Sequence, residues 1–183
     1  MRVDATSLPG VQLITPVRHG DARGFFSETY VESRYETAGI PVRFVQDNHA
    51  MSAAIGTVRG LHWQIGANAQ DKLVRVTRGA IFDVAVDIRR ASPTFGQWVG
   101  VELSAANWSQ LFVPIGFAHG YCTLHPDTEV LYKTSAVYDS GAERSVRWDD
   151  PAIGISWPPV VDPALLSNKD RIAPLLADAQ DLF

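Results

Sequence analysis

Two of the five histidines in this sequence stand where an imidazole can take part in proton transfer. His62 lies in the segment 59–64 (RGLHWQ), which is predicted as a strand, and strict alternation places Gly60, His62 and Gln64 on one face. His119 follows a turn that contains proline and glycine, and it therefore lies at the start of a new strand. Because imidazole titrates near physiological pH, both residues are candidates for acid–base chemistry, although a structural role stays open for each.

A metal site is the second chemistry that these histidines suggest. The spacing P-x-G-x-x-H over residues 114–119 matches the second motif of the cupin barrels, in which the histidine often ligates a metal. The first cupin motif requires a His-x-His pair, whereas this sequence reads HWQ at 62–64. With Gln64 in place of the second histidine, the three His or carboxylate ligands that a transition metal normally needs are not assembled. The sequence therefore favours metal-free proton transfer, with a metal-dependent cupin as the alternative.

Basic and phenolic side chains lie near these histidines, although the chain as a whole is acidic. Arg59 precedes His62 by three positions, and Lys72 opens the next predicted strand. Arg23 opens an earlier one. If these cations converge inside a barrel they form an anion site; solvated charges at strand edges are the alternative. Tyr132 alternates with Val130 and Thr134 in segment 129–134, which suits core packing or proton donation.

Short stretches rich in β-branched and aromatic residues, separated by turn residues, recur along the chain. They predict strands at 11–15, 24–30, 42–45, 57–63, 72–77, 81–88, 97–103, 111–113, 119–124, 129–134 and 145–148. Helices are predicted only at 31–38 and, as one or two short pieces interrupted by Pro174, within 164–181. Strands at this spacing with few helices predict an all-β protein, an antiparallel sandwich or barrel.

Composition limits the possible classes of protein. The 183 residues include 16 Lys+Arg and 20 Asp+Glu, a net charge of −4, and 46% are hydrophobic. This length and hydrophobic content predict one domain spanning 1–183, and a pI of about 5.7 argues against a nucleic-acid partner. No apolar run reaches the ~20 residues of a membrane span, and the N-terminal residues lack a signal-peptide pattern, so we expect a soluble, cytoplasmic protein. The single Cys122 excludes an intramolecular disulfide and a cysteine-based zinc site.

Longer motifs cover nearly the whole chain. They are DARGFFSE (21–28), FVQDNH (44–49), VRGLHWQ (58–64), QDKLVRVTRGAIFDVAVDIR (70–89), SPTFGQWVGVELSA (92–105), VPIGFAHGY (113–121), EVLYKT (129–134), ERSVRWDDPAIGISWP (143–158) and LSNKD (166–170). In this order they resemble the dTDP-4-dehydrorhamnose 3,5-epimerases, metal-free cupin enzymes. The resemblance implies a cupin-type jelly-roll barrel with short peripheral helices, working without cofactor as a homodimer with strand exchange near the N-terminus.

The resemblance also implies a reaction and a substrate. The expected activity converts dTDP-4-dehydro-6-deoxy-D-glucose into dTDP-4-dehydro-L-rhamnose by epimerisation at C3 and C5, in the dTDP-L-rhamnose pathway that supplies cell-surface polysaccharides. His62 matches the proton acceptor, Asp170 the carboxylate paired with it, and Tyr132 the proton donor. Lys72 matches the lysine that faces the C4 carbonyl, and Tyr138 the aromatic residue that stacks on thymine. The other matches are substrate-binding positions: Arg23, Phe26, Glu28, Gln46, Asp47, Asn48, Arg59, Gln64, His119, Glu143 and Lys169.

The chemistry of a 4-ketosugar agrees with these implied roles. A C4 ketone acidifies the hydrogens on C3 and C5, because the anion left behind delocalises as an enolate. A neutral imidazole suits the removal of such a proton, and a fixed ammonium at O4 suits the enolate oxygen. Two further alternatives stay open: an epimerase that acts only at C3 or only at C5 of another dTDP-deoxysugar, and a barrel that binds a sugar nucleotide without catalysis.

Overall fold

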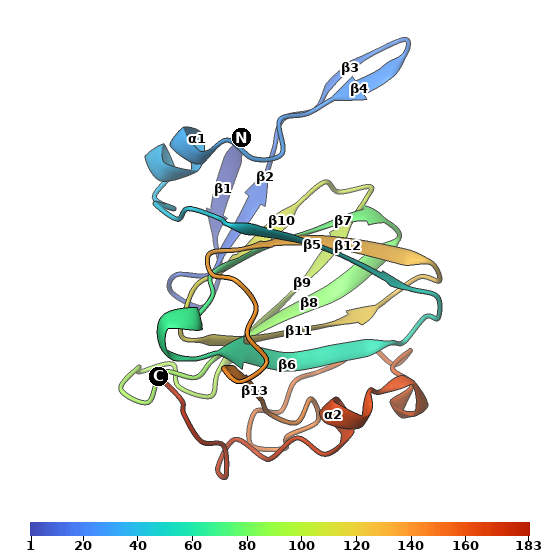
Figure 1. Cartoon of the computed structure of the whole chain (residues 1–183). Coiled ribbons are helices and arrows are strands. Elements are labelled where there is room, and N and C mark those ends of the chain that lie inside the picture. Colours follow the sequence, from blue (N-terminus) through green and yellow to red (C-terminus); the bar gives the residue numbers. More distant parts are fainter.

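The computed structural model describes residues 1–183 and consists mainly of two antiparallel β-sheets packed face to face (Figure 1). The six-stranded sheet has the order β1 (Arg2–Ala5), β2 (Gln12–Thr15), β10 (Gln110–Val113), β7 (Lys72–Arg78), β12 (Thr128–Thr134) and β5 (Gln46–Ser52). The five-stranded sheet has the order β13 (Glu143–Ser145), β6 (Val58–Gln64), β11 (Phe117–Thr123), β8 (Ala80–Asp87) and β9 (Trp98–Ser104). The predicted all-β jelly-roll barrel is confirmed.

Apolar side chains from both sheets form the main core between them. Val74 and Val130 reach into it from the six-stranded sheet, and Ile81 and Ala85 from the five-stranded sheet. None of these four is more than 2% exposed. Burial of apolar surface, worth about 25 cal/mol per Å², is the chief force that holds the two sheets together. The strands therefore form a rigid frame for any polar side chains that point between them.

Short helical segments pack around this frame. Helix α1 (Glu32–Thr37) packs Tyr35 against Leu73 on the outer face of β7, so that β7 is covered on both sides. A short 3-10 helix, η1 (Gly66–Asn68), follows β6. Near the C-terminus η2 (Pro163–Leu165) and α2 (Asn168–Arg171) run beneath β6 (Figure 1). No helix combines the length and the apolar character that crossing a lipid bilayer requires.

Four sequence predictions of secondary structure are wrong in place or extent. The strand predicted at 145–148 corresponds to β13, which spans Glu143–Ser145. Residues 42–45 form no strand; the strand is β5, which begins at Gln46, while Val42 and Phe44 pack beneath α1. Polar residues dominate β5 because it is the edge of the six-stranded sheet, so a pattern of β-branched residues does not mark this strand. The strand predicted at 24–30 ends at residue 26, and the C-terminal helices lie at 163–171, before Pro174. Strands β1 and β3 (His19–Asp21) were not predicted.

A two-stranded hairpin, formed by β3 and β4 (Gly24–Phe26), projects away from the barrel (Figure 1). Phe25 is its main contact with the rest of the chain, because its ring packs edge-on against Trp108 with the centroids 4.9 Å apart. Phe26 beside it is 67% exposed. The hairpin therefore presents an aromatic side chain to solvent, well away from its own barrel.

Candidate active site

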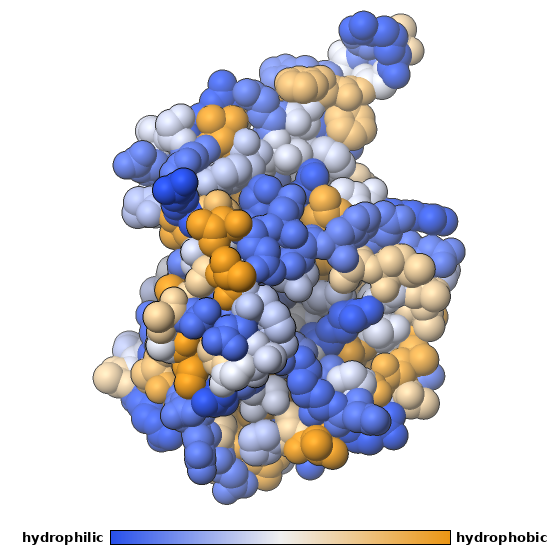
Figure 2. All heavy atoms as spheres, in the orientation of Figure 1, coloured by the Kyte–Doolittle hydropathy of each residue, from blue (hydrophilic) through white to orange (hydrophobic).

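A pocket of about 460 Å³ opens between the two sheets. Figure 2 shows a hollow near the middle of the face in view, with hydrophilic side chains around it. Of the sixteen side chains that the sequence predicts for a site, nine line this pocket: Arg59, His62, Lys72, His119, Tyr132, Tyr138, Glu143, Lys169 and Asp170. They come from both sheets, from α2 and, for Tyr138, from the connection between β12 and β13, so only the folded barrel brings them together.

His62 and Asp170 form the tightest polar pair in the pocket. Asp170, at the start of α2, accepts a hydrogen bond from His62 Nε2 at 2.5 Å, and Ser167 Oγ donates to its second oxygen at 2.9 Å. Burial raises the pKa of Asp170, but the hydrogen bonds from His62 and Ser167 outweigh it and bring the pKa below its ordinary value. Burial lowers the pKa of His62, with Asp170 opposing. The imidazole is therefore neutral at pH 7, with its proton toward Asp170 and the Nδ1 lone pair available as a base.

A bulge in β6 brings Arg59 onto the same side as His62. His62 pairs with His119 and Arg59 pairs with Tyr121, so three steps along β6 face only two along β11. This extra residue breaks the strict alternation that the sequence predicted. Gly60 sits in the bulge with φ +125°, and a Cβ there would lie 2.6 Å from the Cα of Gly120. Glycine is therefore required at the close approach that aims Arg59 and His62 together.

Lys72 and Tyr132 reach the pocket from the opposite sheet, on the neighbouring strands β7 and β12. Lys72 Nζ donates to the backbone oxygen of His62 at 3.3 Å, which spans the gap between the sheets. Burial lowers the pKa of Lys72 to about 8, although the charges of Asp83 and Glu143 oppose it. Burial raises the pKa of Tyr132. At pH 7 the site thus holds an ammonium and a protonated phenol facing a neutral imidazole.

A second imidazole–carboxylate pair lies deeper in the pocket. His119 Nε2 is 2.7 Å from Asp83 Oδ1, and both side chains are buried. The other carboxylate oxygen of Asp83 has no hydrogen-bond partner. Asp83 is not among the predicted site residues, and neither is Tyr121, which lies two positions after His119 on the same face of β11 and lines the pocket. The signal for Asp83 was an acidic residue inside an otherwise apolar strand, since such a residue is rarely buried without a partner.

Three charged or polar residues form the rim of the pocket beside Asp170. Glu143 accepts a hydrogen bond from Lys169 Nζ at 2.7 Å through one oxygen, and from the Tyr138 hydroxyl at 3.1 Å through the other. Burial raises the pKa of Glu143, but Lys169 outweighs it, so the pKa lies below its ordinary value. Glu143 therefore links the segment that carries Tyr138 to helix α2.

Two cationic side chains of the pocket have no carboxylate partner. Its three carboxylates lie against His62, His119 and Lys169. Lys72 and Arg59 have no carboxylate within ion-pair distance; Arg59 Nε donates only to Ser52 Oγ and its Nη2 only to the oxygen of Met51, each at 3.2 Å. A guanidinium free of carboxylates can bind a phosphate oxygen pair, and a free ammonium can stabilise an oxyanion. The pocket is thus suited to an anionic substrate that develops further negative charge.

Comparison with known proteins identifies the family of this chain. A family profile described as dTDP-4-dehydrorhamnose 3,5-epimerase matches residues 5–178. The dTDP-4-dehydrorhamnose 3,5-epimerase of Salmonella typhimurium is 53% identical over 180 residues, which cover 98% of this chain and 97% of that one. The chain belongs to the dTDP-4-dehydrorhamnose 3,5-epimerase family.

Solved structures of the epimerase family share the fold of this chain. The Bacillus anthracis enzyme, solved with TDP and PPi bound, aligns with a TM-score of 0.91 at 49% identity, over 95% of this chain and 98% of that one. The Legionella pneumophila enzyme, described as a dTDP-6-deoxy-D-glucose-3,5-epimerase in complex with dTDP-4-keto-L-rhamnose, aligns with a TM-score of 0.90 at 45% identity, over 96% and 93%.

Seven predicted site residues lie outside the pocket in this member of the epimerase family. Arg23 and Phe26 are on the projecting hairpin, and Glu28 follows it. Arg23 pairs with Asp21 of the same hairpin, and Glu28 pairs with Arg34. These side chains therefore do not reach the pocket of their own chain.

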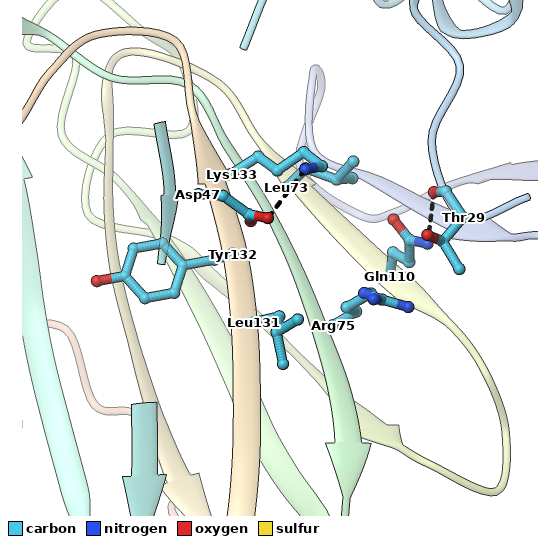
Figure 3. Close-up of a pocket in the computed structure, with 8 residues that line it drawn as sticks. All are labelled: Thr29, Asp47, Leu73, Arg75, Gln110, Leu131, Tyr132 and Lys133. Carbon is cyan, nitrogen blue, oxygen red and sulfur yellow. Dashed lines mark hydrogen bonds and ion pairs between the residues drawn. The ribbon is translucent and has the colours of Figure 1, made fainter. Parts of the chain in front are cut away.

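The other four lie around β5 and the end of β6. Gln46 and Asn48 face a hollow of about 310 Å³ that adjoins the pocket at Tyr132 and Tyr138. The side-chain amide of Gln64 is hydrogen-bonded to backbone groups of residues 68, 137 and 139. Asp47 points to the opposite face of the six-stranded sheet, because side chains alternate along β5, and there it pairs with Lys133 at 3.3 Å (Figure 3).

No three His, Cys, Asp or Glu side chains gather closely enough to hold a metal ion. The nearest arrangements are His62 with Asp170 and His119 with Asp83, each one imidazole and one carboxylate. Gln64 stands where the first cupin motif has its second histidine, and its side-chain amide is hydrogen-bonded to the backbone N–H of Asp139. The donor set therefore does not fit a resident transition metal.

Proposed function

We propose that this chain catalyses the conversion of dTDP-4-dehydro-6-deoxy-D-glucose into dTDP-4-dehydro-L-rhamnose, a 3,5-epimerisation in dTDP-L-rhamnose biosynthesis. The observation that carries the proposal is the convergence of four groups in one pocket: the His62–Asp170 pair on one side, and Lys72 with Tyr132 on the other. The names of the relatives support the same reaction.

Inversion at a carbon beside a ketone requires a base on one face of the sugar and an acid on the other. His62 takes the proton from C5 or C3 on Nδ1, and the electron pair of that C–H bond delocalises into the C4 carbonyl to give an enolate. Tyr132 donates its hydroxyl proton to the same carbon from the opposite face, which restores the ketone with inverted configuration. The imidazolium then loses its proton to water, and the phenolate regains one, before the second carbon reacts. Because His62 and Tyr132 come from different sheets, they flank a sugar held between them.

Asp170 and Lys72 stabilise the charges that form in this step. Asp170 holds the imidazole in the tautomer that exposes Nδ1, and its carboxylate stabilises the imidazolium. Lys72 places its ammonium against O4, where negative charge grows as the enolate forms. This contact strengthens in the transition state more than in the ground state, which is the condition for an increase in kcat.

The rest of the pocket binds the nucleotide and the sugar. Arg59, which has no carboxylate partner, binds the diphosphate through its planar guanidinium. His119 supplies a second imidazole on the floor of the pocket. Tyr138, Glu143 and Lys169 form the rim, where the Tyr138 ring stacks on the thymine base.

We also propose that the working form is a homodimer in which the hairpin of one copy completes the pocket of the other. Arg23 and Phe26 match substrate-binding positions, yet both project from their own barrel (Figure 1). A mixture of His62→Ala and Arg23→Ala chains, denatured and refolded together, tests this. One site of each mixed dimer then has both an intact His62 and an intact Arg23, so that about a quarter of wild-type activity returns from two impaired variants. A mixture no more active than its components refutes the exchange of hairpins.

Solvent exchange tests the reaction itself. Wild-type chain in D2O should place deuterium at both C3 and C5 of the product, as read by NMR. His62→Ala should abolish exchange at both carbons, while His49→Ala, an exposed histidine paired with Glu129 outside the pocket, should not. Label at one carbon only assigns a single-position epimerase, and exchange retained in His62→Ala refutes this residue as the base. Because we propose a metal-free reaction, activity should also survive dialysis against a chelator; loss that added metal restores would favour a metal-dependent cupin.

A further inference from the structure

Side-chain amides hold the backbone of the segment 136–139, which carries Tyr138. The N–H of Tyr138 donates to Gln46 Oε1 at 2.9 Å, and the N–H of Asp139 donates to Gln64 Oε1 at 2.7 Å. The carbonyl of Val137 accepts from Gln64 Nε2 at 3.4 Å, and the carbonyl of Ala136 accepts from Gln70 Nε2 at 2.8 Å. Four consecutive residues thus bond to three glutamines, which belong to β5, β6 and the loop before β7.

These bonds replace the strand pairing that the segment lacks. Residues 135–142 connect β12 to β13 without regular secondary structure, and such a connection is usually among the more mobile parts of a fold. Gln64 is only 3% exposed, so its hydrogen bonds are shielded from water and costly to break. The Tyr138 side chain nevertheless remains 51% exposed. The backbone is fixed while the ring stays available.

Tyr138 stands at the boundary between two hollows. It lines the main pocket beside His62 and Lys169, and it lines the adjoining hollow of about 310 Å³ beside Gln46 and Gln70. A ring in this place is a wall against which a flat base can stack, provided that its backbone does not move.

We infer that Gln46, Gln64 and Gln70 are positioning residues that clamp this segment and so hold Tyr138 as a preformed wall for the nucleobase. The inference rests on the proposed function, because it takes Tyr138 to contact the base. It differs from direct substrate binding by these glutamines: the amide oxygens of Gln46 and Gln64 already accept from the backbone of the segment, and Gln64 Nε2 also donates to the carbonyl of residue 68 at 2.8 Å. A wall ordered in advance spares the ordering cost that binding would otherwise carry.

A double-mutant cycle between Gln64 and Tyr138 tests the clamp, with dTDP as the probe and calorimetry as the measurement. Gln64→Leu should weaken dTDP binding about threefold to tenfold, the scale of ordering one short segment. In the Tyr138→Ala background the same change should weaken binding less than twofold, because no wall remains to be positioned. At saturating sugar nucleotide, kcat of Gln64→Leu should stay within about twofold of wild type, since the reacting groups are untouched.

Gln110→Leu is the matched control. Gln110 is also buried, at 2% exposure, and its Nε2 donates to a backbone oxygen, that of Thr29, at 2.9 Å; it lies in the cavity of Figure 3, on the outer face of the sheet. Its loss should lower the melting temperature and leave dTDP affinity unchanged. Should Gln64→Leu fail to fold, Gln70→Leu, which removes a single hydrogen bond, takes its place in the cycle.

The outcomes separate the clamp from the proposed function. Unchanged dTDP affinity in Gln64→Leu and Gln70→Leu overturns the clamp. Equal losses with and without Tyr138 also overturn it, because they mean that the glutamine acts on the ligand by another route. A wild-type chain that binds no dTDP overturns both the clamp and the proposed substrate class, whereas a wild-type chain that binds dTDP but shows no exchange at C3 or C5 overturns the proposed reaction alone.

Discussion

Raising the pH from 7 to 9 should remove most of the epimerase activity by deprotonating Lys72. Burial in the pocket lowers the pKa of Lys72 from 10.5 to about 8, because the negative charges of Asp83 and Glu143 offset only part of the desolvation, and Lys169 adds to the shift. Only the charged ammonium stabilises an enolate oxygen. The alkaline side of the pH–rate profile therefore reports the protonation of this one residue.

The size of the effect distinguishes a shifted lysine from an ordinary one. With a pKa of about 8, about 91% of Lys72 is protonated at pH 7 and about 9% at pH 9, so kcat/KM falls roughly tenfold. A lysine with a pKa of 10.5 would stay about 97% protonated at pH 9, and activity would hardly change. Tyr132 does not cause the decline, since burial raises its pKa above 10. On the acid side, activity falls as His62 takes up a proton, below pH 6.5 because burial lowers the pKa of His62.

Initial rates at low substrate concentration, measured from pH 5.5 to 10, give the profile. In Lys72→Arg the guanidinium stays charged across this range, so the alkaline decline should vanish even if the overall rate is lower. In Lys169→Met the decline should move to higher pH, because the positive charge of Lys169 lowers the pKa of Lys72. A wild-type profile that is flat to pH 10, or an unchanged decline in Lys72→Arg, refutes the assignment.

The same shift has a consequence for stability. Below pH 8 Lys72 is charged in both the folded and unfolded chain, so the cost of burying the charge is fully present. Between pH 8 and 10.5 the unfolded chain binds more protons than the folded one, and stability rises with pH. The shift corresponds to at most about 3 kcal/mol, less in an open pocket. Lys72→Met should therefore raise the free energy of unfolding at pH 7, measured in urea, while turnover falls. An unchanged or lower free energy of unfolding would contradict a cost of burying the Lys72 charge.

Three other substitutions probe the base, the acid and the bulge. Asp170→Asn should lower kcat by roughly 10²- to 10⁴-fold with dTDP affinity kept, because the imidazole loses the carboxylate that sets its tautomer; a loss in affinity alone would contradict this. Tyr132→Phe should still exchange deuterium into recovered substrate while product formation, followed by NMR, collapses. Gly60→Ala should destabilise the chain by roughly 2–4 kcal/mol in urea unfolding, because its Cβ would lie 2.6 Å from the Gly120 Cα; Gly66→Ala, with open space around it, should cost only about 1 kcal/mol.

Local pattern predicts the strands of this barrel where they are built from apolar and β-branched residues. β8, which is buried along most of its length, is predicted to within a residue at each end. β5 is not predicted, because an edge strand needs apolar residues on one face at most, and Gln46–Ser52 is largely polar. β1 and β3 were missed because they are short strands with partly or fully exposed side chains.

The parts of the site that the sequence reveals least are those that depend on long-range geometry. His62 and His119 are marked by their own neighbours, but Asp170 lies 108 positions from His62 and was reached only through the family resemblance. Arg59 shares the pocket with His62 because of the bulge, which alternation does not anticipate. Asp83 is hidden in an apolar strand, since only the register of β8 against β11 brings it to His119.

Net charge shows why a global property says little about such a site. The chain carries a charge of −4, which argues against a broad basic surface but not against a cationic pocket. Within the pocket each carboxylate is paired with an imidazole or with Lys169, so these carboxylates do not neutralise the other cations. Arg59 and Lys72 are left without such partners, and these are the two cations that we propose bind the diphosphate and the enolate. The chemistry is therefore set by which charges remain unpaired inside the barrel, and this follows from strand register and from the bulge at Gly60.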